Sequence, residues 1–193
     1  MSTFIVSDTH FGHSGIIRMC GRPFVDAHGE PDVRLMDETL EANWSAVVRK
    51  DDTVIHLGDF AHRYPADRLP QLFSRLNGKK VLIRGNHDGP ETCALPWQSV
   101  HDILVTSIDS QRVVLCHYAM RTWPGIRKGA LQLYGHSHGR LPGNQQSMDI
   151  GVDVMGWSPV RLNTIKAVMA QLPPMVEPEG GEDIESDIGG VKP

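Results

Sequence analysis

Five short runs of aliphatic and β-branched residues recur along this chain, and each leads directly into polar side chains. The runs cover residues 4–6, 54–57, 81–83, 113–115 and 131–134. Their length and composition are typical of strands in a largely buried sheet. A carboxylate, carboxamide or imidazole follows each run within three residues, and α/β sheets gather their ligands at the carboxyl ends of strands. The pattern predicts a buried sheet with one convergent polar site.

Helical patterns lie between these runs. Apolar residues recur at three- and four-residue steps over residues 33–48 and 69–76, and the second pattern stops at Asn77-Gly78, a natural helix end. Ser158-Pro159 predicts the N-cap and first position of a last helix, with an apolar face of Ile165, Val168, Met169 and Leu172. The strand-rich stretch 100–153 indicates a second or a mixed sheet, so the predicted fold class is α/β.

The chain divides into one domain and a short acidic tail. Its 193 residues are enough for a single domain with a sizeable core, and we find no internal repeat. Residues 173–193 carry six acids and one base and are rich in Gly and Pro, a composition typical of disorder. We therefore expect one domain over residues 1–172 and a disordered tail over residues 173–193.

Composition argues against several classes of protein. No apolar run reaches the roughly 18 residues of a membrane span, and the first residues lack the features of a signal peptide, so we expect a cytoplasmic protein. Cys20, Cys93 and Cys116 show no C-x-x-C spacing, which argues against a disulfide framework or a cysteine zinc site. No basic stripe indicates non-specific nucleic-acid binding, and no protein partner can be inferred.

The polar side chains that follow the runs form a candidate metal centre. Two pairs of them are spaced two residues apart, which in an extended chain places both members on one face. Glycines at 58, 85 and 135 precede the polar groups, where a small residue allows a sharp turn or a close approach. The seven candidate ligands are Asp8, His10, Asp59, Asn86, His117, His136 and His138.

This set of oxygen and nitrogen donors suits manganese, iron or zinc better than copper(I) or an iron–sulfur cluster. Seven ligands are too many for one tetrahedral ion but natural for two ions that share a bridging carboxylate. Two ions about 3.5 to 4 Å apart are the usual arrangement for in-line displacement at phosphorus. The set therefore favours hydrolysis of phosphate esters.

The order of the motifs resembles that of the calcineurin-like metallophosphoesterase superfamily: Asp-x-His, Gly-Asp, Gly-Asn-His-Asp, a lone His and Gly-His-x-His. The motifs run from residue 7 to residue 138 and so cover most of the predicted domain. Residues 7–13 and 151–153 are most similar to the small single-domain bacterial and phage-encoded members. The resemblance implies a four-layer α/β sandwich, in which two mixed β-sheets are flanked by helices.

The resemblance also implies a role for each candidate ligand. Asp8, His10 and His138 would hold one ion, Asn86, His117 and His136 would hold the second, and Asp59 would bridge them. The two divalent ions are expected to be Mn²⁺, with iron, zinc and nickel as the alternatives. The expected chemistry is attack of a metal-bridging hydroxide on phosphorus.

Two neighbouring residues are the candidate catalytic pair. His87 matches the catalytic histidine of the family and would assist the leaving oxygen. Asp88 would orient the imidazole of His87 or, with equal weight, cap the following turn.

Three further histidines lie near the motifs. His62 and His13 each follow a candidate ligand by three residues and are candidates for the mouth of the site, with His62 a candidate substrate-binding residue. A surface role is an equal alternative for both. His56 lies inside a predicted strand and is expected to be packed and hydrogen-bonded.

Two loops carry weaker signals for substrate binding. Arg121 could bind a phosphate oxygen and Trp123 could form a wall of the pocket, although a solvated arginine and a core tryptophan are the plainer interpretations. Residues 20–31, whose flanking arginines include Arg22, form a candidate lid.

We therefore predict a metal-dependent phosphoric ester hydrolase, with phosphodiesters preferred over phosphomonoesters. The substrate would be a small phosphorylated molecule, and nucleotides and short oligonucleotides are included in that class. The alternative is a non-catalytic metal-binding or protein-interaction module on the same fold, but such relatives lose ligands or the catalytic histidine. A structural metal protein would instead use four thiolate or imidazole ligands around one zinc ion.

Overall fold

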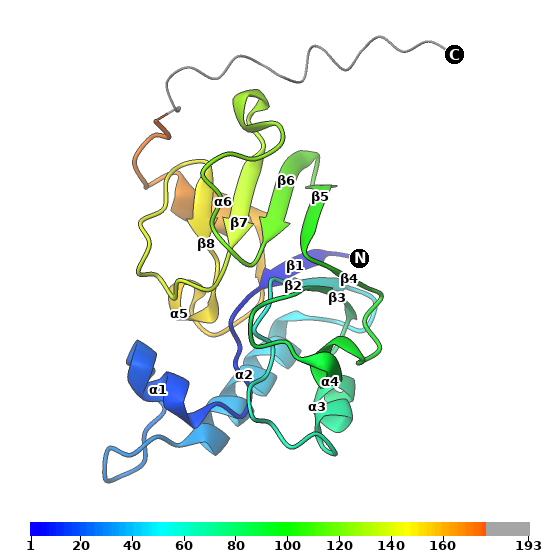
Figure 1. Ribbon diagram of the computed structural model, residues 1–193, viewed down its shortest axis with the longest axis vertical. Helices are drawn as coiled ribbons and strands as arrows, with labels where there is room; N and C mark the ends of the chain where they lie inside the picture. Colours follow the sequence, from blue (N-terminus) through cyan, green and yellow to red (C-terminus); the bar gives the residue numbers. More distant parts are fainter. Residues whose placement is uncertain (177–193) are drawn as a thin grey trace.

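The protein is built on two β-sheets, which a computed structural model describes for residues 1–176 (Figure 1). The first sheet has five strands in the order β4-β3-β2-β1-β9. They are β1 (Thr3–Val6), β2 (Thr53–His56), β3 (Lys79–Ile83), β4 (Ser99–His101) and β9 (Val160–Arg161). Strands β1 to β4 are parallel, and β9 pairs antiparallel with β1. The carboxyl ends of β1, β2 and β3 therefore meet at one edge of the sheet.

The second sheet has four strands in chain order. They are β5 (Ile103–Ile108), β6 (Gln111–Cys116), β7 (Leu131–Tyr134) and β8 (Ser147–Asp149). β5 and β6 form an antiparallel hairpin, whereas β6, β7 and β8 are parallel. An isolated parallel bridge between Ser7 and Gly151 joins the segment after β8 to the segment after β1. This bridge brings the polar ends of the two sheets together.

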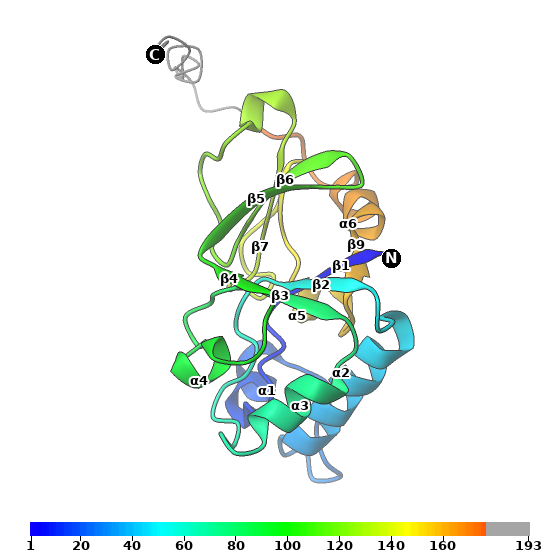
Figure 2. The same ribbon diagram turned by 90° about the vertical axis from the view of Figure 1, so that its right-hand side faces the viewer.

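Helices cover the outer face of the first sheet, as Figure 2 shows. They are α1 (Ser14–Cys20), α2 (Val33–Val47), α3 (Leu69–Arg75) and α4 (Pro90–Cys93). One apolar core lies between this sheet and the helices, and a second core, which includes residues of α6 (Leu162–Met169), contains apolar residues of both sheets. A third cluster beside β6 includes Trp123 and Ala130. The remaining short elements are α5 (Val152–Met155) and the 3-10 helix η1 (Ile126–Lys128).

The predicted fold is confirmed, with two mixed sheets flanked by helices. The five predicted strands are β1, β2, β3, β6 and β7, and the helical patterns over 33–48 and 69–76 are α2 and α3. The Asp32 carboxylate caps α2 by accepting a hydrogen bond of 2.9 Å from the Leu35 N–H. Most of the expected tail lies outside the described residues.

The predicted start of the last helix is wrong. Ser158-Pro159 does not begin a helix, because the next two residues form strand β9 and pair with Phe4 and Ile5 of β1. Helix α6 begins only at Leu162. Of its predicted apolar face, Ile165 and Met169 are buried, whereas Val168 is exposed. The backbone partners offered by β1 outweigh the local capping signal.

Within residues 1–176, no helix combines the length and the apolar character needed to cross a membrane.

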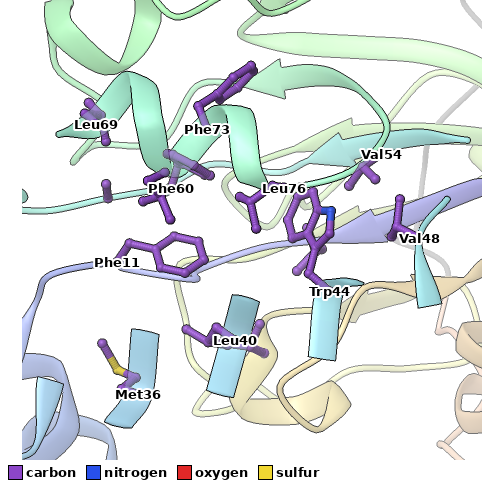
Figure 3. Close-up of a cluster of buried hydrophobic side chains, with 14 of the residues drawn as sticks. Phe11, Met36, Leu40, Trp44, Val48, Val54, Phe60, Leu69, Phe73 and Leu76 are labelled. Atoms are coloured by element: carbon purple, nitrogen blue, oxygen red, sulfur yellow. The ribbon is translucent and has the colours of Figure 1, made fainter. Parts of the chain in front are cut away.

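The inner face of α2 anchors the core against the first sheet (Figure 3). Met36, Leu40 and Trp44 recur every four residues and are buried. The Trp44 indole also donates a hydrogen bond of 2.9 Å to the carbonyl oxygen of Asn77. Residues at four-residue spacing share one helix face, so α2 packs against the core through this face.

Replacing one leucine on each face of α2 tests this packing. Leu40 is 2% exposed and Leu35 is 40% exposed. We expect Leu40→Ala to lower the free energy of unfolding by about 2–5 kcal/mol, because a buried cavity remains. Leu35→Ala should change it by less than about 0.5 kcal/mol. Urea unfolding of both variants measures this, and equal losses would contradict the assigned faces.

Candidate functional site

The backbone of the site is held in an unusual conformation. Five of the seven candidate ligands have a positive φ: Asp8 (59°), His10 (50°), Asp59 (57°), His136 (65°) and His138 (48°). Residues with side chains rarely adopt this left-handed region, and such residues cluster at functional sites. The turn that each makes after its strand redirects the chain at the sheet edge.

Two of the predicted glycines allow carboxylates to approach the backbone closely. A Cβ atom on Gly135 would collide with the Ser7 hydroxyl and the Asp8 carboxylate, and one on Gly85 would collide with the Asp59 carboxylate. The next backbone N–H, that of His136, donates to both oxygens of Asp8 at 3.0 and 3.1 Å. These contacts tie the loop after β7 to the loop after β1.

The first group of candidate ligands consists of Asp8, His10 and His138. Each offers one ligand atom, and these three atoms lie within 4.8 Å of one another. The Nε2 atoms of His10 and His138 lie 4.0 and 3.9 Å from Oδ1 of Asp8. The spacing leaves room for one ion between them.

The second group consists of Asp59, His117 and His136, with ligand atoms again within 4.8 Å of one another. Asn86 joins this group, because its Oδ1 lies 3.1 Å from Nε2 of His117. The His117 ring is buried, whereas Asn86 and His136 are exposed. This group therefore has one face open to solvent.

Asp59 lies between the two groups. Its Oδ2 is 3.4 Å from Nε2 of His10 in the first group and 3.5 Å from Nε2 of His117 in the second. Its Oδ1 accepts a hydrogen bond of 2.9 Å from the backbone N–H of His87. One carboxylate thus faces both groups.

The buried atoms of the first group fit a divalent cation. Within the described residues, Nε2 of His10 is the buried side-chain nitrogen or oxygen that has no hydrogen-bond partner. Burial lowers the pKa of His10 far below its ordinary range, so its imidazole is neutral and offers a lone pair. Burial also raises the pKa of Asp8 to about 7. Burial disfavours the charged carboxylate of Asp8, and an adjacent cation would stabilise that charge. Divalent cations of this class bind neutral imidazole together with carboxylate.

A buried arginine and aspartate orient His138. Nδ1 of His138 donates to Oδ2 of Asp153 at 2.7 Å, which directs Nε2 toward Asp8. Burial works against the charged imidazole, but the hydrogen bond to Asp153 raises the pKa of His138 to about 10. Arg22, which is 2% exposed, donates to both oxygens of Asp153 at 2.9 and 2.8 Å. Metal-binding histidines commonly donate their other N–H to such a carboxylate.

The second group has a different support. Nδ1 of His117 lies 2.8 Å from the backbone carbonyl oxygen of Leu57, which accepts its proton. That contact leaves Nε2 of His117 facing Asp59 and Asn86. A carboxylate thus orients His138 in the first group, whereas a backbone carbonyl oxygen orients His117 in the second.

His87 lines the same cavity as the candidate ligands. The cavity has a volume of about 220 Å³, and His10, Asp59, Asn86, His136 and His138 also line it. The ring of His87 lies 5.3 Å from that of His10 and 4.4 Å from that of His62, measured between centroids. His13 lies 4.4 Å from His62 by the same measure. His13 also lines the cavity, whereas His62 lies beside His87 without lining it.

Asp88 does not orient His87. Its carboxylate accepts hydrogen bonds of 2.8 to 2.9 Å from the backbone N–H groups of Gly85, Asp59 and Phe60. These bonds occupy both oxygens and join the loop after β3 to the loop after β2. The Asp88 carboxylate thus contacts the backbone of these two loops, an arrangement that favours a structural role over the predicted orientation of His87.

Other candidates lie away from the two groups. Trp123 is buried, and its indole donates 2.8 Å to the carbonyl oxygen of Ala130. Neither Trp123 nor the exposed Arg121 lines the cavity described above. His56 is buried and hydrogen-bonded as predicted: Nδ1 accepts from the Gly58 N–H at 3.2 Å, and Nε2 lies 2.9 Å from the Thr9 hydroxyl.

The pairing of Arg22 with Asp153 is the feature that sequence patterns missed. Arg22 was expected beside a lid, but it is buried and also donates to the carbonyl oxygens of Asp8 and Thr9 at 2.8 and 3.1 Å. Its partner Asp153 is 131 residues away in the chain. The similarity of residues 151–153 to small family members was the one signal that pointed to Asp153.

Comparison with known proteins supports a shared fold and family. The family model described as calcineurin-like phosphoesterase matches residues 1–168. An uncharacterized protein of Methanocaldococcus jannaschii is 31% identical over 172 residues, which cover 84% of this chain and 88% of that protein. The gene 66 protein of Mycobacterium phage L5 is 40% identical over 91 residues, covering 46% of this chain and 41% of the phage protein. A crystal structure of an Aquifex aeolicus protein of unknown function has a TM-score of 0.65 at 20% identity and covers 86% of this chain and 98% of that one.

Removing the charge of Asp153 tests its support of the first group. We expect Asp153→Asn to weaken the binding of a divalent metal ion at the first group by about 10- to 100-fold, because His138 loses its carboxylate partner. The second binding event should be unchanged, because Leu57 still orients His117. Calorimetric titration of the metal-free protein measures both events.

Two further variants isolate this effect. Asp153→Asn leaves Arg22 as a buried unpaired charge, so the double variant Arg22→Met/Asp153→Asn should recover stability but not metal affinity. Asp102→Asn, which removes an exposed carboxylate, is the control. Equal weakening of both binding events in the double variant would contradict the assignment.

Proposed function

The chain belongs to the calcineurin-like phosphoesterase family, and on that premise we propose that it is a phosphodiesterase that works with two divalent metal ions. The family implies a phosphoester substrate and divalent ions. We propose Mn²⁺ as the native ion, with iron, zinc and nickel to be compared with it. The catalytic domain in this proposal comprises residues 1–172.

The position of Asp59 is the observation that carries the proposal. Its Oδ2 lies within 3.5 Å of imidazole nitrogens from both ligand groups, as expected for a carboxylate shared by two ions. The first ion would be held by Asp8, His10 and His138. The second would be held by Asn86, His117 and His136.

Divalent ions held here would supply positive charge that lowers the pKa of water and offsets the charge of a phosphate group. The chain supplies the remaining functions. The side-chain amide of Asn86 provides a donor for a non-bridging phosphate oxygen. His136 and Asn86 line the open face of the cavity, from which the phosphate group would enter.

His87 is proposed to transfer a proton to the leaving oxygen. Its backbone N–H is bonded to Asp59, so the position of its ring is coupled to that of the bridging carboxylate. Its side chain is half-buried and lines the cavity with Asn86 and His136. A positioned imidazole of this kind contributes about 10²- to 10⁴-fold to proton transfer.

The cavity volume of about 220 Å³ supports a small substrate. It admits a phosphoryl group and a short substituent more readily than a segment of folded protein. We therefore propose small phosphodiesters, including nucleotides and short oligonucleotides, over phosphoproteins.

Removing the His87 imidazole tests the proton transfer. For an alkyl phosphodiester, whose leaving group needs a proton, we expect metal-loaded His87→Ala to lose about 10²- to 10⁴-fold in kcat. The loss should be smaller for bis-p-nitrophenyl phosphate, because p-nitrophenolate leaves without protonation. His28→Ala, at an exposed position, serves as the control. Unchanged rates for both esters would show that His87 is not the acid.

Removing the Asp59 carboxylate tests the bridge. We expect Asp59→Ala to bind fewer than two ions per chain after dialysis against Mn²⁺, because both groups lose a shared ligand. Asp67→Asn, at an exposed turn, should retain both ions. Elemental analysis measures the content, and retention of two ions by Asp59→Ala would overturn the assignment. A loaded wild-type protein that hydrolyses no phosphoester would favour the non-catalytic alternative.

A further inference from the structure

A second cavity adjoins the metal cavity at His87. It has a volume of about 280 Å³, and His87 is the residue that lines both cavities. Its other walls come from the loop after β2, from the first residue of α3 and from the region of α4. They include Arg63, Tyr64, Ala66, Leu69 and Glu91. The proposed proton donor thus stands between a space lined by metal ligands and a space that contains none of them.

The second cavity has an apolar base and a charged rim. Ala61 and Leu69 are buried, whereas Arg63 and Glu91 are exposed. Within residues 1–176, neither charged side chain forms an ion pair or a side-chain hydrogen bond with another residue. The guanidinium therefore remains available to an acceptor and the carboxylate to a donor. This combination suits an organic group with apolar faces and polar edges.

Several contacts join the walls of the cavity to neighbouring segments. Tyr64 packs directly over Gly12, where an added Cβ would lie 2.9 Å from its ring. Its hydroxyl interacts with Arg75, which is itself paired with Glu41. Arg63 has a φ of 58°, in the same left-handed region as Asp59. The loop before it is bonded to the loop after β1 through the His62 N–H and the carbonyl oxygen of Phe11, at 3.0 Å.

We infer that this second cavity binds the leaving group of the substrate. The preferred substrate is then a phosphodiester whose leaving alcohol is a sizeable organic group that presents an acceptor to Arg63. This inference rests on the proposed function, because that function assigns His87 to the leaving oxygen. In the reaction, one water is consumed, its oxygen bonds to phosphorus, the bond from phosphorus to the leaving oxygen breaks, and that oxygen receives a proton. The proton donor must border the leaving group, and of the residues that line the metal cavity, His87 borders the second one.

Three monoanionic substrates distinguish the effect of the leaving group on the rate from the effect of the other substituent. Bis-p-nitrophenyl phosphate has a large leaving group and a large second arm. Methyl p-nitrophenyl phosphate keeps the large leaving group with a small arm. Methyl phosphorofluoridate has a small arm and loses only fluoride. Nitrophenolate absorbance and a fluoride electrode follow the reactions.

Two substitutions alter the second cavity without touching the metal ligands. Ala66→Trp fills it from an exposed turn, and Arg63→Ala removes its guanidinium. We expect each to lower kcat/KM for both nitrophenyl substrates by about 10-fold or more, since a charged hydrogen bond or the space for the ring is lost. Hydrolysis of the fluoridate should stay within about twofold, with unchanged metal content and thermal midpoint. Asp67→Trp and Arg68→Ala, at neighbouring exposed positions outside the cavity lining, are the matched controls.

Other outcomes overturn the inference in distinguishable ways. Loss confined to the bis-nitrophenyl ester would assign the cavity to the non-leaving arm. Equal loss for all three substrates, or no loss for any, would show that the cavity does not select the leaving group. If the loaded wild-type protein hydrolyses none of the three, the proposed function fails and the inference fails with it.

Discussion

The carboxylate of Asp59 and the buried imidazole of His10 set the main constraint on this molecule. They lie 3.4 Å apart almost without solvent, and Nε2 of His10 has no hydrogen-bond partner in the described part of the chain. Burial of unpaired polar groups is costly, and a carboxylate that also faces His117 gains from added positive charge. Within residues 1–176, this cost falls on the contact between His10 and Asp59, and a bound cation would offset it.

The loops around that place are held by carboxylates that accept backbone N–H groups. Asp88 joins the loops after β2 and β3, and Asp8 joins the loop after β1 to the loop after β7. Asp149 accepts from the backbone of Gly139 and Gly151 at 2.9 and 2.7 Å. The bonds from Asp59 to Asp88 and from His136 to Asp8 connect loops that follow different strands, so hydrogen bonds between loops help to fix the ligand positions.

The two ligand groups are supported unequally. The first depends on a buried arginine–aspartate pair behind His138, and the second depends on a backbone carbonyl behind His117. An imidazole that donates its N–H to a carboxylate is more basic than one that donates to a neutral carbonyl oxygen. The two proposed ion positions are therefore expected to differ in affinity, although the Asp59 carboxylate faces both groups.

Much of the fold and of the candidate site could be predicted from local sequence. The apolar runs determine their own strands, and the glycine and polar residues that follow them mark the turns at the sheet edge. The start of α6 could not be predicted in this way, because the pairing of residues 160 and 161 with β1 replaced the helix signal of Ser158-Pro159. Asp88 likewise has a sequence position that suits catalysis, yet its distant backbone partners give it a structural role.

By itself, the sequence determined which side chains are available to bind metal and that they follow buried strands. Only the tertiary structure decided that Asp59 faces both groups, that Arg22 supports Asp153, and that His87 lines two cavities. The physical reason is that a strand pattern is encoded by neighbours along the chain. A bond between residues 131 positions apart depends on how the two sheets pack.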